Sequence, residues 1–381
     1  MKFIHTADWQ LGMTRHFLSG EAQPRFTESR VDAIRRIGQL ATDEGCEFVV
    51  VCGDVFESNQ IDRKVLARAL DAMATTPSVT FYLLPGNHDP LDAASIFSSN
   101  TFRERPLPNV IVLEDSAPIR VAEGVELVAA PWTSKRPLRD LVDQACAVAE
   151  PSAALRIITG HGALDSRSPD AANPALISLE RLEERVEAGQ INYVALGDRH
   201  STTDEGTSGR IWYSGAPEPT DYDETDPGNV LVVELRPERV EVTPRKIGTW
   251  SFQQHESHLT SDADIDSLEQ WLNALEDKQR TVVKLSLVGQ VSLAQKGRLD
   301  RLLDHFADLF AALETWERRS DLVVVPDEIE VADLGLSGFA NDALGDLQEL
   351  ALASDAFDDE SRAVAAQDAM ALLYRLVGSA Q

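Results

Sequence analysis

Five short polar segments of the chain each follow an apolar run with the composition of a buried strand. Every segment carries a carboxylate, amide or imidazole group, the side chains that bind divalent metal ions. They are Asp8-Trp9-Gln10, Gly53-Asp54, Gly86-Asn87-His88-Asp89, Gly160-His161-Gly162 and Gly197-Asp198-Arg199-His200. Because ligands bind at the carboxyl ends of the strands in α/β sheets, we expect the five segments to surround a common point.

Each of these segments is a weak signal by itself. A Gly-Asp pair after a strand more often forms a turn or a helix cap, and a lone Asn-His is usually solvated. Five such segments in order along one chain are far more specific. The glycines beside them suit tight turns and a close approach of the backbone to a bound group.

The elements that must position these segments are apolar strands that alternate with amphipathic helices in residues 1–246. Buried runs with crossover helices, followed by antiparallel strands, predict an α/β sandwich rather than a purely parallel sheet. We expect a meander after Pro106 and closing antiparallel strands near the end of this region. The expected strands are Lys2–Thr6, Phe48–Cys52, Thr80–Leu84, Val110–Leu113, Ile119–Val121, Val125–Ala129, Ile157–Thr159, Tyr193–Leu196, Ile211–Ser214, Val230–Leu235 and Val240–Lys246.

A smaller region follows. Residues 247–265 are polar and weakly periodic, which predicts a linker, and residues 266–381 are predicted to form an α+β accessory domain. This region is expected to contain the helices Asp266–Leu275, Leu293–Leu313, Asp342–Leu352 and Ser361–Val377 and the strands Thr281–Val288 and Leu322–Val325.

Composition sets further limits. The length of 381 residues favours two domains. The first ten residues have no apolar signal region, and no apolar run approaches the roughly 18 residues that span a bilayer, so we expect a cytoplasmic chain with no membrane segment. The cysteines Cys46, Cys52 and Cys146 have no CxxC spacing, which argues against a disulfide framework and a cysteine zinc site.

The net charge of −28 is divided equally between residues 1–245 and residues 246–381, with −14 in each. A protein that binds nucleic acid by itself usually carries a basic surface, because phosphate contacts supply most of the affinity. Composition alone therefore disfavours nucleic acid as a ligand.

The five segments resemble the metallophosphoesterase motifs DxH, GDxx, GNHD, GHxx and GHxH of the calcineurin-like superfamily. Gly53-Asp54 and Gly86-Asn87-His88-Asp89 match fully, while GDVFES and Trp212-Tyr213-Ser214-Gly215 resemble segments of SbcD-like nucleases. The resemblance covers roughly residues 1–246, and the rest resembles, less specifically, the accessory region of bacterial SbcD-like exonucleases. It implies a four-layer α-β-β-α sandwich that binds two divalent metal ions.

The resemblance also implies a ligand for each motif position. Asp54 would bridge two ions, the first held by Asp8, Gln10, Asp54 and His200 and the second by Asp54, Asn87, His161 and Asp198. Gln10 and Asp198 stand where the family has histidine. Both keep an oxygen donor, and the oxygen-rich set suits Mn²⁺, with Mg²⁺ or Fe²⁺ as alternatives, better than zinc.

Three further expectations concern side chains that are not ligands. His88 is expected to protonate the leaving oxygen or to stabilise the transition state. Glu57 occupies the place of the residue that orients this histidine in relatives, which predicts a Glu57–His88 pair. Arg15, His16 and Arg25 are expected to face the substrate.

The function implied is that of a two-metal DNA exonuclease or endonuclease subunit of an SbcCD-like repair complex. Its partners would be DNA and an SbcC-like coiled-coil ATPase, the latter bound by apolar residues such as Met370 and Leu373, and a homodimer stays open. Two alternatives remain. The acidic charge favours a phosphodiesterase for small molecules such as nucleotides, and the two replaced imidazoles favour a non-catalytic subunit.

Overall fold

The computed structural model describes residues 1–148, 154–170 and 172–325 and isolated positions between 342 and 369. The chain divides into two compact units, Met1–Trp250 and Ser251–Gln381. Most of the last two expected helices, Asp342–Leu352 and Ser361–Val377, lies outside the described residues. In the described part of the chain no helix has the length and apolar character to cross a membrane.

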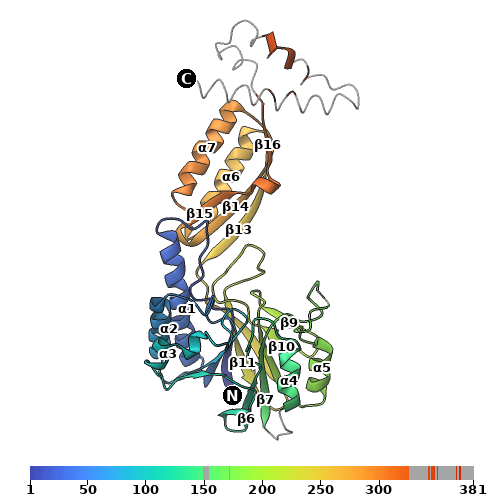
Figure 1. Ribbon diagram of the computed structural model, residues 1–381. Coiled ribbons are helices and arrows are strands. Elements are labelled where there is room, and N and C mark those ends of the chain that lie inside the picture. The colour runs from blue at the N-terminus through green and yellow to red at the C-terminus, as the bar shows by residue number, and fades with distance from the viewer. Residues whose placement is uncertain are drawn as a thin grey trace. The chain divides into compact units, whose positions relative to one another are not determined.

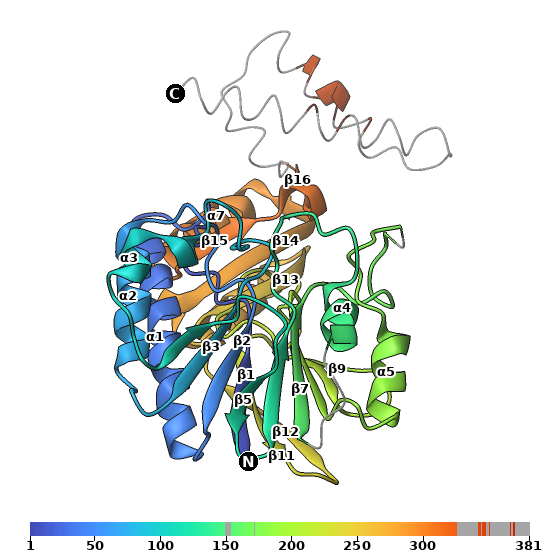
Figure 2. The ribbon, with the colours of Figure 1, turned by 60° about the horizontal axis from the view of Figure 1, so that its bottom comes forward.

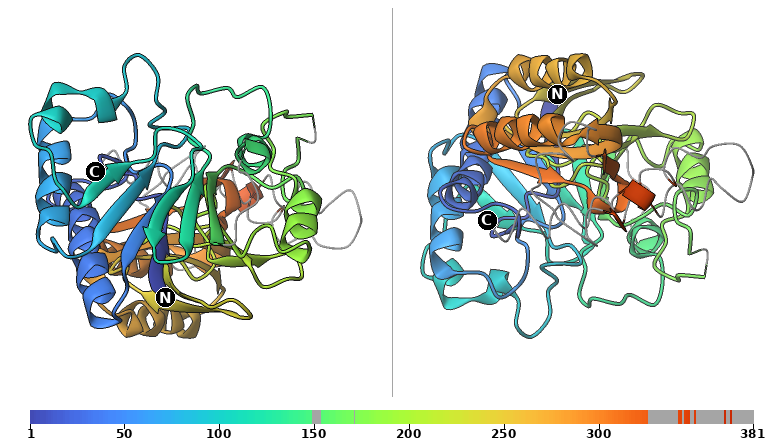
Figure 3. Two further views of the ribbon diagram at one scale, coloured as in Figure 1. Left: turned by 90° about the horizontal axis from the view of Figure 1, so that it is seen from below. Right: turned by 90° about the horizontal axis from the view of Figure 1, so that it is seen from above.

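The first unit contains two six-stranded sheets that pack face to face between helices (Figure 1). Helices α1–α3 cover one sheet, and α4 and α5 cover the other (Figures 2 and 3). The predicted four-layer α/β sandwich is confirmed.

The first sheet has the order β12 (Val240–Lys246), β11 (Asn229–Leu235), β1 (Lys2–Thr6), β2 (Phe48–Cys52), β3 (Thr80–Leu84) and β4 (Val110–Val112). The second has the order β5 (Ile119–Ala122), β6 (Val125–Ala129), β7 (Leu155–His161), β8 (Tyr193–Gly197), β10 (Ile211–Tyr213) and β9 (Thr203–Glu205). The helices are α1 (Ala22–Asp43), α2 (Arg63–Ala74), α3 (Asn100–Arg103), α4 (Leu141–Val148) and α5 (Leu179–Glu187).

Burial on both faces explains why the central strands are apolar throughout. All residues of β2 are buried. Val49 and Val51 belong to the core beneath the helices, whereas Phe48 and Val50 belong to the core between the sheets. Successive side chains of a strand point to opposite faces, so a central strand of this sandwich needs apolar residues at every position.

The meander predicted after Pro106 is wrong. Strand β4 pairs parallel with β3 in the first sheet, and β5 and β6 form an antiparallel pair in the second sheet. The chain therefore crosses between sheets after β4. Strand β10 was predicted to be one of the closing antiparallel strands. It pairs parallel with β8 and antiparallel only with β9, a strand that was not predicted.

The first unit ends at Trp250, four residues beyond the predicted boundary. The Trp250 backbone N–H donates to the buried Glu218 carboxylate at 3.0 Å. Its indole ring packs edge-on against Phe26, with the ring centroids 4.9 Å apart. These contacts attach the segment after β12 to the core of the first unit.

The described part of the second unit contains a parallel sheet with two crossover helices. Its strands are β13 (Ser251–Leu259), β14 (Thr281–Ser292), β15 (Ala312–Thr315) and β16 (Asp321–Val325), and its helices are α6 (Asp262–Ala274) and α7 (Leu293–Ala307). Residues 247–265 are not a linker, because β13 pairs with β14 along its full length. The expected helix Leu293–Leu313 is too long, since α7 ends at Ala307 and β15 follows.

Capping boxes determine where α6 and α7 begin. Ser261 and Asp264 cap the start of α6, and Ser292 and Gln295 cap the start of α7. In this motif two side chains satisfy backbone N–H groups that have no partner within the helix. Helix α6 therefore begins at Asp262, before the predicted start at Asp266.

Candidate metal centre

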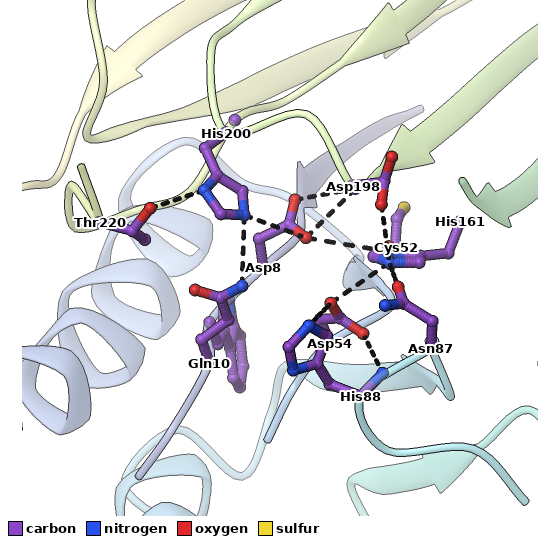
Figure 4. Close-up of polar contacts among 12 residues, drawn as sticks. Asp8, Gln10, Cys52, Asp54, Asn87, His88, His161, Asp198, His200 and Thr220 are labelled. Carbon is purple, nitrogen blue, oxygen red and sulfur yellow. Dashed lines mark hydrogen bonds and ion pairs between the residues drawn. The ribbon is translucent and has the colours of Figure 1, made fainter. Parts of the chain in front are cut away.

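The structure brings the five polar segments together at the carboxyl ends of β1, β2, β3, β7 and β8 (Figure 4). Asp8, Asp54 and His161 are buried, and each offers one ligand atom within 4.8 Å of the others. Strands from both sheets contribute, so the centre depends on the packing of the sandwich. This group is a candidate metal site.

The orientation of His161 defines the middle of the centre. Its Nδ1 lies 2.8 Å from the carbonyl oxygen of Cys52, which can only accept, so Nδ1 carries a proton. Its Nε2 lies 2.7 Å from Asn87 Oδ1, 3.4 Å from Asp54 Oδ2 and 3.8 Å from Asp198 Oδ1. A neutral imidazole would present a lone pair to these three oxygens. The arrangement therefore favours a positive species at Nε2, either a proton or a metal cation.

The pKa values of His161, Asp8 and Asp54 also indicate that the centre favours a positive charge among its carboxylates. Burial acts to lower the pKa of His161, but the carboxylates of Asp54, Asp8 and Asp198 raise it well above its ordinary value. Burial raises the pKa of Asp8 to about 6. Burial also acts to raise the pKa of Asp54, but His161 outweighs it and holds that pKa below the usual value. A divalent cation would compensate these carboxylates more fully than one proton does.

His200 has the environment of an oriented metal ligand. Its Nδ1 lies 2.6 Å from Thr220 Oγ1 and 3.1 Å from Glu224 Oε1, while its Nε2 lies 4.0 Å from Asp8 Oδ1. A carboxylate on one ring nitrogen commonly fixes the other nitrogen toward a metal. Next to it, Gln10 Nε2 lies 3.2 Å from His200 Nε2, and Gln10 Oε1 is buried without a hydrogen-bond partner among the described residues. The residues present therefore fit a divalent ion.

Strained backbone is concentrated at the same place. Asp8, Gln10, Asp54 and Asp198 have φ angles of 54°, 43°, 50° and 99°, a region that residues other than glycine rarely adopt. Only Asp226 and Asp277 share this property among the other described non-glycine residues. Such strain persists where surrounding structure imposes it and is typical of functional sites.

Two glycines, Gly53 and Gly197, lie where a side chain would collide with His161 or with the Cys52 backbone. A Cβ on Gly53 would lie 2.2 Å from His161 Nδ1, and a Cβ on Gly197 would lie 1.9 Å from the Cys52 carbonyl oxygen. Gly53 also has a φ of +90°. The ends of β2, β7 and β8 can approach one another only because these positions lack side chains.

His88 lies beside the centre and is held by its neighbours. Its backbone N–H donates to Asp54 Oδ1 at 3.0 Å, and its Nδ1 lies 3.0 Å from the carbonyl oxygen of Glu57. The predicted Glu57–His88 pair therefore forms through the main chain of Glu57 rather than through its carboxylate. Glu57 Oε2 is buried and has no hydrogen-bond partner in the described part of the chain. The carbonyl makes this contact because the segment after β2 lies alongside His88.

Several residues support the centre in roles that the sequence did not predict. Asp89 accepts hydrogen bonds from the backbones of Gly86 at 2.7 Å and Phe56 at 3.0 Å, and burial raises its pKa to about 7. Arg30, a buried cation in α1, donates to the Trp9 carbonyl at 2.8 Å. A charged residue on the apolar face of a helix was the available signal for Arg30. Thr220 and Glu224 lie in the connection between β10 and β11, away from the strand ends, so no local pattern marks them.

The three residues predicted to face the substrate, Arg15, His16 and Arg25, are not among the candidate metal ligands. Arg15 donates a hydrogen bond to the Thr220 carbonyl. Arg25 forms an ion pair with Glu21 at 3.1 Å, and His16 is exposed between β1 and α1. Arg15 is connected to the centre through Thr220, which contacts His200.

The chain belongs to the calcineurin-like phosphoesterase family, which it matches over residues 1–233. It is thus a metal-dependent phosphoesterase, a hydrolytic enzyme. The family assignment confirms the resemblance drawn from the five segments.

Two curated relatives are each named as the D subunit of the nuclease SbcCD. That of Rhodobacter capsulatus is 31% identical over 94 residues, 24% of this chain and 22% of that protein. That of Bacillus subtilis is 28% identical over 104 residues, 26% of this chain and 25% of that protein. The chain spans about a quarter of the length of these relatives.

Among the solved structures to which the chain is similar is a dimetal phosphatase from Danio rerio, 12% identical, with a TM-score of 0.39 over 65% of this chain and 96% of that one. Another is the protein TT1561 of Thermus thermophilus, 9% identical, with a TM-score of 0.39 over 65% of this chain and 98% of that one.

Proposed function

We propose that this phosphoesterase is the nuclease subunit of an SbcCD-like DNA-repair complex and hydrolyses the phosphodiester bonds of DNA. The observation that carries the proposal is the convergence of the five segments around His161 Nε2, which faces oxygens of Asn87, Asp54 and Asp198. The two SbcCD relatives support DNA as the substrate class.

Asp54 would contribute to both of two ions, because its carboxylate lies within 4.8 Å of ligand atoms of Asp8, in the first group of donors, and His161, in the second. When bound, two divalent ions clamp a phosphodiester and make a water molecule nucleophilic at neutral pH. The first ion would be held by Asp8, Gln10, Asp54 and His200, and the second by Asp54, Asn87, His161 and Asp198.

The chain itself supplies the proton for the leaving oxygen. His88 is 39% exposed, so it is accessible to substrate, and its Nε2 lies 3.9 Å from Asp54 Oδ2. Since Nδ1 donates to the Glu57 carbonyl, Nε2 is the nitrogen that gains and loses a proton. We therefore assign His88 as the general acid.

The oxygen-rich ligand set predicts a preference for Mn²⁺, with Mg²⁺ or Fe²⁺ as alternatives. Changing Gln10→His and Asp198→His together should raise zinc affinity roughly tenfold or more, because zinc favours imidazole nitrogen over amide oxygen. Competition titration against a zinc indicator measures this change. The control variant, Gln190→His with Asp71→His, changes the same residue types at exposed positions. Equal zinc affinity in both variants would mean that neither Gln10 nor Asp198 is a ligand.

The acidic charge leads to a test of the nuclease assignment. Because its net charge is −28, the isolated chain has few surfaces that can contact phosphates. It should therefore bind duplex DNA weakly at physiological salt. An SbcC-like ATPase should raise the affinity by orders of magnitude, and residues 251–381 should be required. Titrations with and without the partner, on the full chain and on a chain ending at Trp250, measure both effects.

One outcome favours a different function. If the full chain with its partner hydrolyses small phosphodiesters but leaves linear DNA intact, a nucleotide phosphodiesterase replaces the nuclease. The net charge is the observation that supports this second candidate, because a small anionic substrate needs no basic surface.

A further inference from the structure

A short basic loop joins β6 to α4. Residues 133–139, Thr-Ser-Lys-Arg-Pro-Leu-Arg, contain three cations and no acidic residue in a chain of net charge −28. Lys135, Arg136 and Arg139 are exposed. Leu138 is 82% exposed, the highest value among the exposed large hydrophobic residues of the described chain. We refer to residues 133–139 as the basic loop; the connection that contains it forms a long open turn before α4 (Figure 3).

The basic loop begins at the metal centre. The preceding residue, Trp132, donates from its indole N–H to the carbonyl oxygen of the candidate ligand His161 at 2.7 Å. Its backbone N–H donates to Pro85 at 3.1 Å, and its carbonyl accepts from Leu91 at 2.8 Å. Pro85 and Leu91 flank the segment that carries Asn87 and His88. Trp132 therefore fixes the start of the loop against two of the five segments.

The other end of the basic loop is also fixed. Asp140 accepts from the backbone N–H groups of Val142 and Asp143, both at 2.9 Å, which holds the chain at the start of α4. Its second oxygen accepts from the Ser178 backbone at 3.1 Å. Both ends of the loop are thus attached to the folded unit, while all of its residues except the half-buried Pro137 are exposed.

Two cations of the loop are available to a ligand. Lys135 and Arg136 have no carboxylate oxygen within 4.0 Å among the described residues, whereas Arg236 and Arg239 at the β11–β12 turn pair with Glu234 and Glu241. Unpaired cations beside an exposed Leu offer charge for a phosphate and an apolar contact for a sugar or base. A strand of nucleic acid presents both groups at regular intervals.

We propose that the basic loop binds the phosphodiester strand of the substrate as it leaves the metal centre, with Lys135 and Arg136 contacting phosphates. This inference rests on the proposed function, since it names how that same site holds its substrate. The contacts lie beyond the scissile phosphate, so a small phosphodiester would not reach them.

The test compares Lys135→Gln/Arg136→Gln with a control, Arg236→Gln/Arg239→Gln, which removes the same charge at the opposite ends of the strands. For a single-stranded oligonucleotide, the loop variant should show a KM roughly tenfold higher at low salt. The slope of log affinity against log salt should fall by about 0.7 for each lost phosphate contact. Hydrolysis of bis(p-nitrophenyl) phosphate should be unchanged in both variants.

Binding to a phosphorothioate oligonucleotide separates the inference from the proposed function. If the wild-type chain binds this probe through the loop but does not cleave DNA, the inference stands and the nuclease proposal fails. If the wild-type chain cleaves DNA and the loop variant behaves like the control, the inference is wrong and the nuclease proposal stands. A wild-type chain that neither binds nor cleaves the oligonucleotide at low salt, even with an SbcC-like partner present, overturns both.

Discussion

Replacing Asp54 with Ala should remove both metal ions and reduce phosphodiester hydrolysis by roughly 10³-fold or more. Bound ions contribute several kcal/mol to the transition state, and each 1.4 kcal/mol changes the rate tenfold. Asp54 is the carboxylate assigned to both ions, and its Oδ2 lies 3.4 Å from His161 Nε2. Elemental analysis of the purified variant and hydrolysis of bis(p-nitrophenyl) phosphate measure the two losses.

A thermal measurement tests the same assignment without using activity. Mn²⁺ should raise the Tm of the wild-type chain, because an ion that binds only the folded state at 100 times its Kd adds about 2.7 kcal/mol. It should leave the Tm of Asp54→Ala nearly unchanged. The control, Asp71→Ala, removes a carboxylate that is 73% exposed and should respond like the wild type. Two ions retained in Asp54→Ala would contradict its role as the shared ligand.

The positions of the ligand-type residues could be predicted because each lies at or just past the carboxyl end of a strand that is buried at every position or at all but its first. A run such as Phe48–Cys52 is apolar at every position, which identifies both a central strand and its carboxyl end. The local pattern thus predicted where Asp54 lies in the fold. It did not predict the left-handed φ of 50° at Asp54, which is imposed by the surrounding structure.

Elements with mixed surroundings were harder to predict. Strand β13 alternates between side chains that face the core and polar side chains that are exposed, such as Leu259 and His258, so its sequence resembles a linker. After α7, Phe310 and Leu313 continue the helical spacing of apolar residues. Both are still packed against the core of the second unit, but Leu313 belongs to β15. Tertiary packing, rather than local spacing, decides where α7 ends.

Contacts between distant segments could not be predicted from the helical or the strand spacing of apolar residues. His88 is oriented by the backbone carbonyl of Glu57, and any residue type offers a carbonyl at that position. His200 is held by Thr220 and Glu224, which lie in the connection between β10 and β11, where no periodic pattern exists. Sequence patterns identify candidate ligands more readily than the residues that orient them.

Changing His88→Ala should reduce DNA hydrolysis by about 10²- to 10⁴-fold, the usual contribution of a positioned general acid. Both metal ions should remain, because His88 contacts Asp54 through its backbone N–H, which alanine also provides. The loss should be much smaller for bis(p-nitrophenyl) phosphate, whose leaving group departs readily without a proton. Elemental analysis and kcat/KM for the two substrates measure these effects.

The comparison of the two substrates distinguishes the roles that His88 could have. A general acid matters most when the leaving oxygen is a strongly basic alkoxide, so its removal should affect the DNA reaction selectively. An equal loss with both substrates would instead indicate that His88 stabilises charge on the phosphate itself. Loss of metal from the variant would make His88 a ligand and the assigned role wrong. The control, His258→Ala, removes a histidine that is 70% exposed in the second unit and should leave both activities unchanged.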